Sequence, residues 1–476
     1  MNIFDDPFLK LSFAGRLKTR HAREVKASPL SVGFETLDRE LFNPEKCYDL
    51  LAELGVKWAR CQTGWCRCEK SKGVYDFAWL DDVVDNLLRR GVQPWFNLGY
   101  GNILYMKDAP HETAVGHVPT AYGPECVDAW RNYVAALVKH FSSRVKHWEI
   151  WNEPNLDCFW RPLQASGANY AGLIEVTSPV IRSLDPEAKI IACSGPEKMI
   201  DCAFIRQALL AGMGSHIDIF SIHPYGVIPE KQYFSSVAAL RRLLSEYAPH
   251  VKLWQGECGY SAQAFGHHGS WNGFYNATEE TQAHYVARRI VLDSMMKMEL
   301  ISYYHMTDLM EKPYRQANGQ ERPPNMLGLL HGLSYTPKKS YYAYKNLAAI
   351  FDSECKADDL ACYVMDKFNF RQVGALPPLS IIAGTFVRRG YPVYSYYFAE
   401  DLQRCWGGLN DFGLQVVQQT ERPIKTPVLI DVISGSVYRA TDFEMLESDS
   451  VVIRGLPLTD YPLILTDIDA IELQPE

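Results

Sequence analysis

Two glutamates follow apolar, strand-like runs, where a charged side chain is an unusual structural choice. Glu153 follows the run HWEIW and Glu257 follows the run VKLWQG. Paired carboxylates that face a cleft are what glycosidic cleavage requires, because one protonates the departing oxygen and the other stabilises or captures the oxocarbenium-like centre. A single strand-end glutamate more often caps a loop or pairs with an arginine. Two of them, in the contexts WNEPN and QGECG, favour catalysis.

The elements that must position these glutamates alternate between buried strands and amphipathic helices. Strands are expected within residues 31–37, 56–65, 92–102, 146–155, 188–197, 216–226, 251–260 and 300–309, and helices within 43–55, 77–91, 123–144, 167–184, 202–212, 235–247, 279–297 and 338–351. Eight such repeats predict an α/β fold, a closed (β/α)8 or TIM barrel. A doubly wound open sheet would carry a glycine-rich phosphate loop after its first strand, and GFETLDRE contains none.

After about residue 352 the helical pattern gives way to short strand-like runs. These runs are separated by Gly, Pro, Asp and Ser, and turns every 8–12 residues are typical of a β-sandwich. We therefore expect three parts: an N-terminal segment, residues 1–30, that adds strands to the sandwich; a catalytic barrel, residues 31–352; and an accessory β-sandwich, residues 353–476.

Composition and charge exclude several classes of function. The 48 Lys and Arg against 56 Asp and Glu give a net charge of -8 with the two signs mixed, whereas nucleic-acid-binding surfaces are basic and clustered. No run approaches the roughly 18 apolar residues of a membrane span, and the first 30 residues lack the continuous apolar stretch of a signal peptide. Twelve cysteines in 476 residues are too few for a disulfide scaffold. We expect a cytoplasmic protein with reduced thiols, without nucleic-acid or membrane partners, and compatible with a homo-oligomer.

Two motifs carry a resemblance to known enzymes. WNEPNLDCFW (151–160) resembles the acid/base segment of the clan A glycoside hydrolases, and LWQGECGY (253–260) resembles their nucleophile strand. Over roughly residues 31–350 the chain is most similar to glycoside hydrolase family 39, which includes β-xylosidases. The resemblance implies a retaining O-glycosyl hydrolase that works by double displacement, exo-acting on small oligosaccharides or glycosides, with a carbohydrate substrate and with neither cofactor nor metal.

The resemblance assigns roles to individual residues. It makes Glu153 the general acid/base and Glu257 the nucleophile. Asn152 matches the clan asparagine that bonds the 2-hydroxyl of the bound sugar. Tyr225 matches a residue that hydrogen-bonds and orients the nucleophile, and Arg60 matches an arginine near the same carboxylate.

Further residues are candidates for substrate contacts. His223, in IHPYG, is expected to form the wall of a sugar subsite. Trp65, Trp160 and Trp271 are candidates to stack on sugar faces, and of these only Trp160 lies beside a recognised motif. His305 stands where the family often has an aromatic residue, so it either shapes a subsite or is a core histidine bonded to a backbone carbonyl. The adjacent pair His267 and His268 has no spaced carboxylate and makes a poor metal site.

Three alternative functions compete with the exo-acting hydrolase. An endo-acting glycanase of the same clan would have short loops and an open cleft, and the long stretch after Ser261 favours a pocket instead. A non-catalytic carbohydrate-binding barrel would have lost one of the two carboxylates, and both are present. A metal-dependent hydrolase would need clustered His and Asp at strand ends, which the sequence does not supply.

Overall fold

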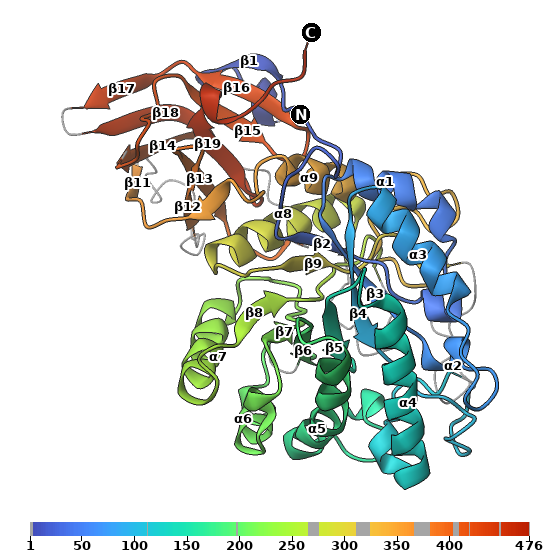
Figure 1. Cartoon of the computed structure of the whole chain (residues 1–476). Coiled ribbons are helices and arrows are strands. Elements are labelled where there is room, and N and C mark those ends of the chain that lie inside the picture. Colours follow the sequence, from blue (N-terminus) through green and yellow to red (C-terminus); the bar gives the residue numbers. More distant parts are fainter. Residues whose placement is uncertain are drawn as a thin grey trace.

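The structure is a computed structural model that describes residues 3–111, 113–196, 199–264, 276–310, 324–365, 381–402, 409–417, 419–446 and 449–475. Its described strands form one closed parallel barrel and two antiparallel sheets (Figure 1). The predicted fold class, a TIM barrel with a C-terminal β-sandwich, is confirmed.

The barrel consists of parallel strands that close on themselves, because β9 pairs with β2. Its strands are β2 (Leu30–Gly33), β3 (Trp58–Gln62), β4 (Gln93–Leu98), β5 (His147–Ile150), β6 (Lys189–Ser194), β7 (Ile219–Ile222), β8 (Lys252–Gln255) and β9 (Ile301–Tyr303). Most of their residues are buried, as expected when side chains fill the barrel on one side and helices cover the other. Each strand is shorter than the run expected from the sequence, and most of the remaining residues of that run lie in the connection at the carboxyl end.

The helices surround this barrel (Figure 1). They are α1 (Tyr48–Glu53), α2 (Trp65–Cys68), α3 (Ala78–Arg89), α4 (Pro124–Phe141), α5 (Gly167–Leu184), α6 (Cys202–Leu210), α7 (Tyr233–Tyr247), α8 (Glu279–Met295) and α9 (Lys339–Ala348). The short α2 was not expected and lies where the sequence suggested the end of a strand. None of the described helices combines the length and the apolar character needed to cross a membrane.

The C-terminal sheets contain both expected and unexpected strands. A larger sheet has the order β1-β16-β15-β19-β13-β12-β10, and a smaller sheet has the order β11-β14-β18-β17. Their bounds are β1 (Leu11–Arg16), β10 (Cys355–Ala357), β11 (Cys362–Met365), β12 (Ile381–Arg388), β13 (Tyr391–Phe398), β14 (Leu409–Val417), β15 (Pro427–Asp431), β16 (Ser436–Ala440), β17 (Phe443–Leu446), β18 (Ser450–Leu458) and β19 (Leu463–Asp467). The register of β14 shifts twice against β18, and such irregular strands lack the alternating pattern that reveals a strand in sequence.

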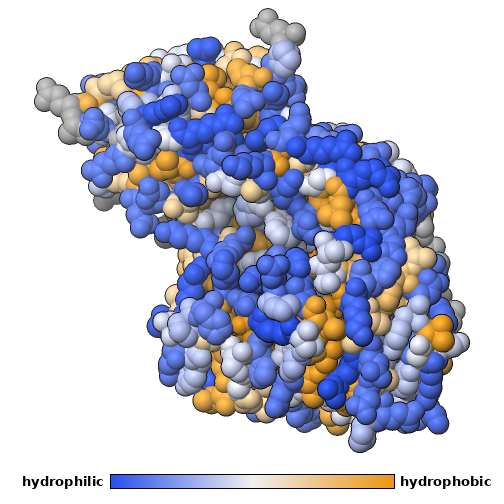
Figure 2. All heavy atoms as spheres, viewed as in Figure 1, coloured by the Kyte–Doolittle hydropathy of each residue, from blue (hydrophilic) through white to orange (hydrophobic). Residues whose placement is uncertain are grey.

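The larger sheet packs on both of its faces. Alternate residues of β13, such as Tyr394 and Tyr396, share one apolar core with Phe412 of the smaller sheet. The opposite face, with Val393 and Tyr397, belongs to the barrel's core cluster. In the space-filling view of Figure 2 the two parts form lobes joined at a narrower waist, and hydrophilic residues cover most of this face.

A cluster of buried charges joins the two lobes. Asp352, which follows α9, accepts hydrogen bonds from Arg20 of the N-terminal segment at 2.5 Å and from Arg388 of β12. Arg388 also donates to the backbone oxygens of Ile350 and Ala470. Burial by itself would raise the pKa of Asp352, but the hydrogen bonds and charges of the two arginines outweigh it and hold that pKa below its usual range. The single carboxylate of Asp352 is thus paired with two cations, Arg20 and Arg388.

Candidate active site

The two strand-end glutamates lie together at the carboxyl end of the barrel. Glu153 lies three residues beyond the end of β5, and Glu257 two residues beyond the end of β8. One carboxylate oxygen of each lies within 4.8 Å of the other and of a ring nitrogen of His223. Both glutamates keep a small exposed fraction, 7% and 9%, so a ligand can reach them. Parallel strands place their carboxyl ends side by side, which is why residues distant in sequence share this site.

Glu257 is held by a cation and by a hydroxyl group. A guanidinium nitrogen of the buried Arg60 donates to Oε2 of Glu257, and the hydroxyl of Tyr225 donates to Oε1 at 2.8 Å. Two donors, one of them positively charged, are the surroundings of an ionised carboxylate whose orientation is restricted. An anion fixed in this way is suited to nucleophilic attack.

Glu153 is held in surroundings that favour its protonated form. Its backbone has φ 46°, in the left-handed region that non-glycine residues rarely adopt and that is frequent at functional sites. Its side chain packs on Gly195, where a Cβ atom would lie only 2.9 Å away. Burial raises the pKa of Glu153 to about 7; the charge of Arg60 opposes this rise and that of Glu149 adds to it. A carboxyl group that keeps its proton near neutrality can act as a general acid.

His223 lies directly against Glu153. Its Nδ1 is 3.0 Å from Oε1 of Glu153, and the side chain is buried. Burial lowers the pKa of His223 to about 4, so the imidazole is neutral near pH 7. A neutral imidazole can accept a hydrogen bond from the protonated carboxyl or, in its other tautomer, donate to the carboxylate. His223 therefore lies behind Glu153 and positions it, whereas the sequence suggested the wall of a sugar subsite.

The WNEPN motif builds this arrangement residue by residue. Trp151, at φ 70°, is anchored by a 2.6 Å hydrogen bond from its Nε1 to the oxygen of Phe159. The amide oxygen of Asn152 accepts a hydrogen bond from Arg60 at 2.8 Å. This contact distinguishes the amide oxygen from the amide nitrogen, which carries the two N–H donors. The side chain of Asn155 makes two hydrogen bonds with the backbone of Gly195: it accepts from the nitrogen at 2.6 Å and donates to the oxygen at 3.3 Å. These hydrogen bonds of the motif thus stabilise the strained turn that contains Glu153.

Arg60 is the centre of the site's charge network. It is fully buried and contacts three carboxylates, those of Glu257, Glu35 and Glu149. Glu149 also accepts from Asn97 at 2.8 Å. Burial raises the pKa of Glu35 to about 8 despite the opposing charge of Arg60, with a further rise from Glu257. A single cation cannot neutralise three buried anions, so the network favours retention of a proton on Glu35.

Sequence reasoning overlooked part of this network. Glu35 and Asn97 were visible as polar residues at strand ends, but no motif assigned them a role. Glu149 lies inside the apolar run HWEIW, whose other residues indicate only a buried strand. The available signal was the charge itself, because a carboxylate in the middle of a buried strand must be paired.

Three further candidates lie away from the cleft. Trp65 is fully buried and its Nε1 donates to Glu69, and Trp160 is fully buried and packs edge-to-face against Trp151 and Tyr170. The expected stacking on a sugar does not fit either position. His305 is also fully buried; its Nε2 lies 3.0 Å from the backbone oxygen of Glu35, and its Nδ1 accepts from the Thr307 nitrogen at 3.3 Å. His305 therefore has the position of a core histidine bonded to a backbone carbonyl, the second of the two alternatives that the sequence left open. Trp271, His267 and His268 lie outside the described residues.

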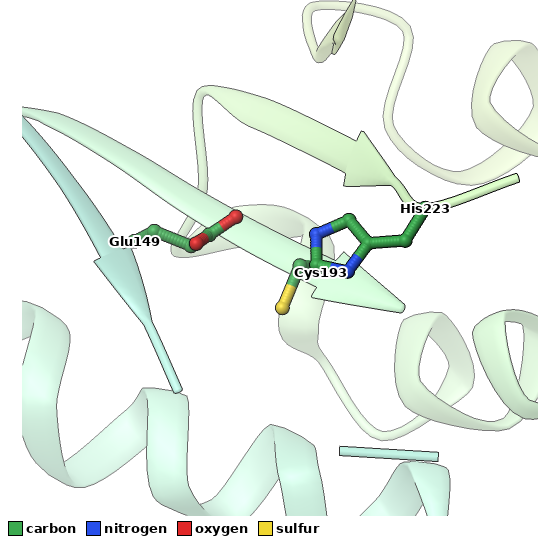
Figure 3. A group of neighbouring side chains, drawn as sticks. All are labelled: Glu149, Cys193 and His223. Atoms are coloured by element: carbon green, nitrogen blue, oxygen red, sulfur yellow. The ribbon is translucent and has the colours of Figure 1, made fainter. Parts of the chain in front are cut away.

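Two groups of side chains in the described part of the chain have the composition of metal ligands. One is Glu153, His223 and Glu257, the group at the carboxyl end of the barrel described above. The other is Glu149, Cys193 and His223, one layer deeper in the barrel (Figure 3). His223 belongs to both groups and separates them.

Comparison with known sequences places the similarity in the barrel. Residues 46–257 match the family described as "Glycosyl hydrolases family 39". A β-xylosidase of Geobacillus stearothermophilus is 30% identical over 145 residues, 27% of this chain and 27% of its own length. A β-xylosidase of Caldicellulosiruptor saccharolyticus is 26% identical over 338 residues, 64% of this chain and 63% of its own. The chain therefore spans less than two thirds of each of these relatives.

Solved structures extend the likeness of fold to the whole chain. A family 39 glycoside hydrolase from the gut symbiont Bacteroides cellulosilyticus WH2 superimposes with a TM-score of 0.64 at 19% identity, covering 94% of this chain and 81% of that one. A family 39 β-xylosidase from Caulobacter crescentus gives 0.56 at 18% identity, covering 98% of both. The resemblance seen in the motifs is confirmed as a similarity: residues 46–257 match glycosyl hydrolase family 39, the chain is similar in sequence to β-xylosidases, and its fold is that of solved family 39 structures.

Proposed function

We propose that this protein is a retaining O-glycoside hydrolase that removes a terminal sugar from small oligosaccharides or glycosides. The observation that carries the proposal is the distance between the carboxylates. Retaining enzymes hold them about 5–5.5 Å apart, whereas inverting enzymes leave about 6.5–9.5 Å for a water molecule. Oxygens of Glu153 and Glu257 within 4.8 Å of one another support the retaining mechanism.

The first step forms a covalent glycosyl-enzyme. The carboxylate of Glu257 attacks the anomeric carbon while Glu153 transfers its proton to the glycosidic oxygen, so that bond breaks and an ester forms. The raised pKa of Glu153, about 7, keeps this proton available. Because Arg60 fixes the oxygen of Asn152, its amide hydrogens are free for the 2-hydroxyl of the sugar, a bond that strengthens in the transition state.

The second step releases the sugar. Glu153, now ionised, takes a proton from a water molecule that attacks the anomeric carbon, and the ester to Glu257 breaks. The proton gained by Glu153 restores the starting state. The neutral imidazole of His223 can accept a hydrogen bond from protonated Glu153 in one tautomer and donate one to ionised Glu153 in the other. It therefore interacts with both forms of Glu153 while it stays uncharged.

The names of the relatives support β-xylosides as the first substrates to test, since two of them are called β-xylosidases. A panel of aryl xyloside, glucoside, galactoside, arabinosides and fucoside would establish the sugar. Release of single sugars from the non-reducing end of an oligosaccharide would support exo action. Products of mixed length would instead identify an endo-acting glycanase.

Variants of the two glutamates test the mechanism. Glu257→Ala should lose turnover by roughly 10⁵-fold or more on every substrate, as expected for a missing nucleophile. Glu153→Ala should lose much less on dinitrophenyl glycosides, because that leaving group needs no proton, and azide should restore its rate with a product of the substrate's anomeric configuration. Glu299→Ala is the matched control, since Glu299 precedes β9 at the opposite end of the barrel and pairs with the exposed Lys252. An inverted azide product would contradict the retaining mechanism.

A further inference from the structure

His223 also belongs to a second group of side chains, whose other two members, Glu149 and Cys193, have no part in the hydrolytic mechanism. Glu149 is in β5, Cys193 is in β6, and His223 follows β7 directly. All three are buried, and one ligand atom of each lies within 4.8 Å of the others. Figure 3 shows the carboxylate of Glu149 and the ring of His223 pointing toward one another, with the sulfur of Cys193 beside them. Three neighbouring strands thus converge on one buried point.

Two of these side chains present an unused polar atom. Oε2 of Glu149 accepts from Arg60 and Asn97, but Oε1 has no hydrogen-bond partner among the described residues. Nδ1 of His223 faces Glu153, while its buried Nε2 is likewise without a partner in the described part of the chain. The Cys193 thiol donates a hydrogen bond of 3.4 Å to the Trp151 oxygen, an ordinary length for sulfur, and also contacts the Tyr170 hydroxyl. Buried polar atoms without partners are costly and therefore point to a ligand.

The three donor atoms suit a thiophilic cation. A thiolate, an imidazole nitrogen and a carboxylate oxygen are all ligands of tetrahedral Zn²⁺, at about 2.0–2.3 Å. Ligand atoms on such an ion lie about 3.3–3.8 Å from each other by that geometry, so shifts on the order of 1 Å would close the group around it. The surroundings carry excess negative charge even with a proton on Glu35, because the one cation Arg60 pairs with both Glu149 and Glu257. A divalent cation would offset that excess.

We propose that Glu149, Cys193 and His223 form an inhibitory binding site for a thiophilic divalent cation such as Zn²⁺ or Cd²⁺. Binding releases the proton of the Cys193 thiol and occupies Nε2 of His223. The imidazole proton must then lie on Nδ1, so His223 can only donate to Glu153 and can no longer accept from its protonated carboxyl. The cation thereby acts on the acid/base without touching the substrate.

The binding experiment uses the full chain and Cd²⁺ in the absence of substrate. A thiolate bound to Cd²⁺ gives a charge-transfer absorption band in the ultraviolet, which we expect at one equivalent for the unmodified protein. Cys193→Ala should abolish this band, because the thiolate that binds the ion is gone. Cys158→Ala, which removes an exposed thiol, is the matched control and should keep the band.

Two outcomes would overturn the proposal: no band in the unmodified protein, or a band that Cys193→Ala retains. Cys193→Ser preserves the size of the side chain, and its band should also be lost, so a folding defect of the alanine variant would not hide the result. Circular dichroism of each variant without metal checks that it is folded.

Inhibition provides a second readout. Cd²⁺ should lower turnover of an aryl glycoside with a poor leaving group at least tenfold more than turnover of the dinitrophenyl glycoside, and Cys193→Ala should remove this difference. Equal inhibition of both substrates would overturn the link to Glu153. Because the absorption band needs no substrate, the metal site can fail while the hydrolytic function stands, or the reverse.

Discussion

Two buried charge clusters in this molecule have opposite compositions. At the junction of barrel and sandwich, Asp352 is shared by Arg20 and Arg388. In the active site, Arg60 is shared by three glutamates. Two arginines hold the pKa of the first carboxylate down in spite of its burial. At the second cluster burial raises the pKa values of Glu35 and of the neighbouring Glu153, because the single charge of Arg60 opposes this rise only in part and other glutamates add to it. A buried carboxylate that is fully paired with cations stabilises the fold. Carboxyl groups whose surroundings shift their pKa values away from one another are typical of a site of acid–base chemistry.

Replacing the central arginine of each cluster should separate the two roles most strongly. Arg60→Lys keeps the charge but cannot bridge three carboxylates, so kcat/KM should fall on the order of 10³-fold, as for a lost preorganised electrostatic contact. Arg388→Lys should leave kcat/KM of the folded protein unchanged and lower the free energy of unfolding by about 3 kcal/mol, because buried partners lose their donors. Steady-state kinetics well below the unfolding temperature measure kcat/KM of both variants, and urea unfolding measures their free energies of unfolding. Similar activity losses in both would refute the distinction.

Replacing a carboxylate in each cluster should change stability unequally. Asp352→Asn leaves two arginines without an anion and should cost about 3 kcal/mol of unfolding free energy. Glu35→Gln replaces a carboxyl that is already largely protonated near pH 7 with a neutral group of the same shape, so the change should stay below about 1 kcal/mol. Urea unfolding at pH 6 compares them. A larger loss for the glutamine variant would mean that Glu35 is ionised in the folded state.

Activity should depend on pH through Glu153. Because its pKa is about 7 and the acid must carry a proton, kcat/KM on a substrate with a poor leaving group should decline above pH 7, approaching tenfold per unit. Glu153→Ala assayed with a dinitrophenyl glycoside should lack this alkaline decline. Initial rates from pH 5 to pH 9 test the prediction. A profile that keeps rising to pH 9 would exclude a carboxylic acid as the proton donor.

Stability should depend on pH with opposite signs in the two clusters. The folded-state pKa of Glu35 is raised from 4.5 to about 8, so its contribution to stability is full below 4.5 and is lost as the pH rises toward 8. The pKa of Asp352 is lowered from 3.8, so its contribution is present above 3.8 and is lost as the pH falls through the folded-state value. One such proton changes the unfolding free energy by at most about 1.4 kcal/mol per pH unit.

Thermal unfolding across pH can detect these small slopes. Glu35→Gln should flatten the decline between pH 4.5 and pH 8, and Asp352→Asn should flatten the loss below pH 4. Slopes that both variants leave unchanged would show that other groups govern the pH dependence.

Much of the fold was predictable because each βα unit carries its pattern locally. Apolar runs such as AKIIACS and amphipathic stretches such as FAWLDDVVDNLLRRG indicate their structure without reference to the rest of the chain. The irregular β14 and the three-residue β10 were not predictable, because their pairing depends on partners elsewhere in the sheets. Trp160 was misplaced for a related reason: an aromatic residue beside a catalytic motif looks the same in sequence whether it faces the cleft or the core.

The sequence by itself determined that two carboxylates end apolar strands, and that the motifs around Glu153 and Glu257 are those of a glycosidase clan. Only the tertiary structure decided that Glu35 and Glu149 also pair with Arg60 and that His223 lies between Glu153 and Cys193. The physical reason is closure of the barrel. Pairing of β9 with β2 brings the first and last strands together, so side chains hundreds of residues apart share one desolvated space, and their charges and pKa values exist only there.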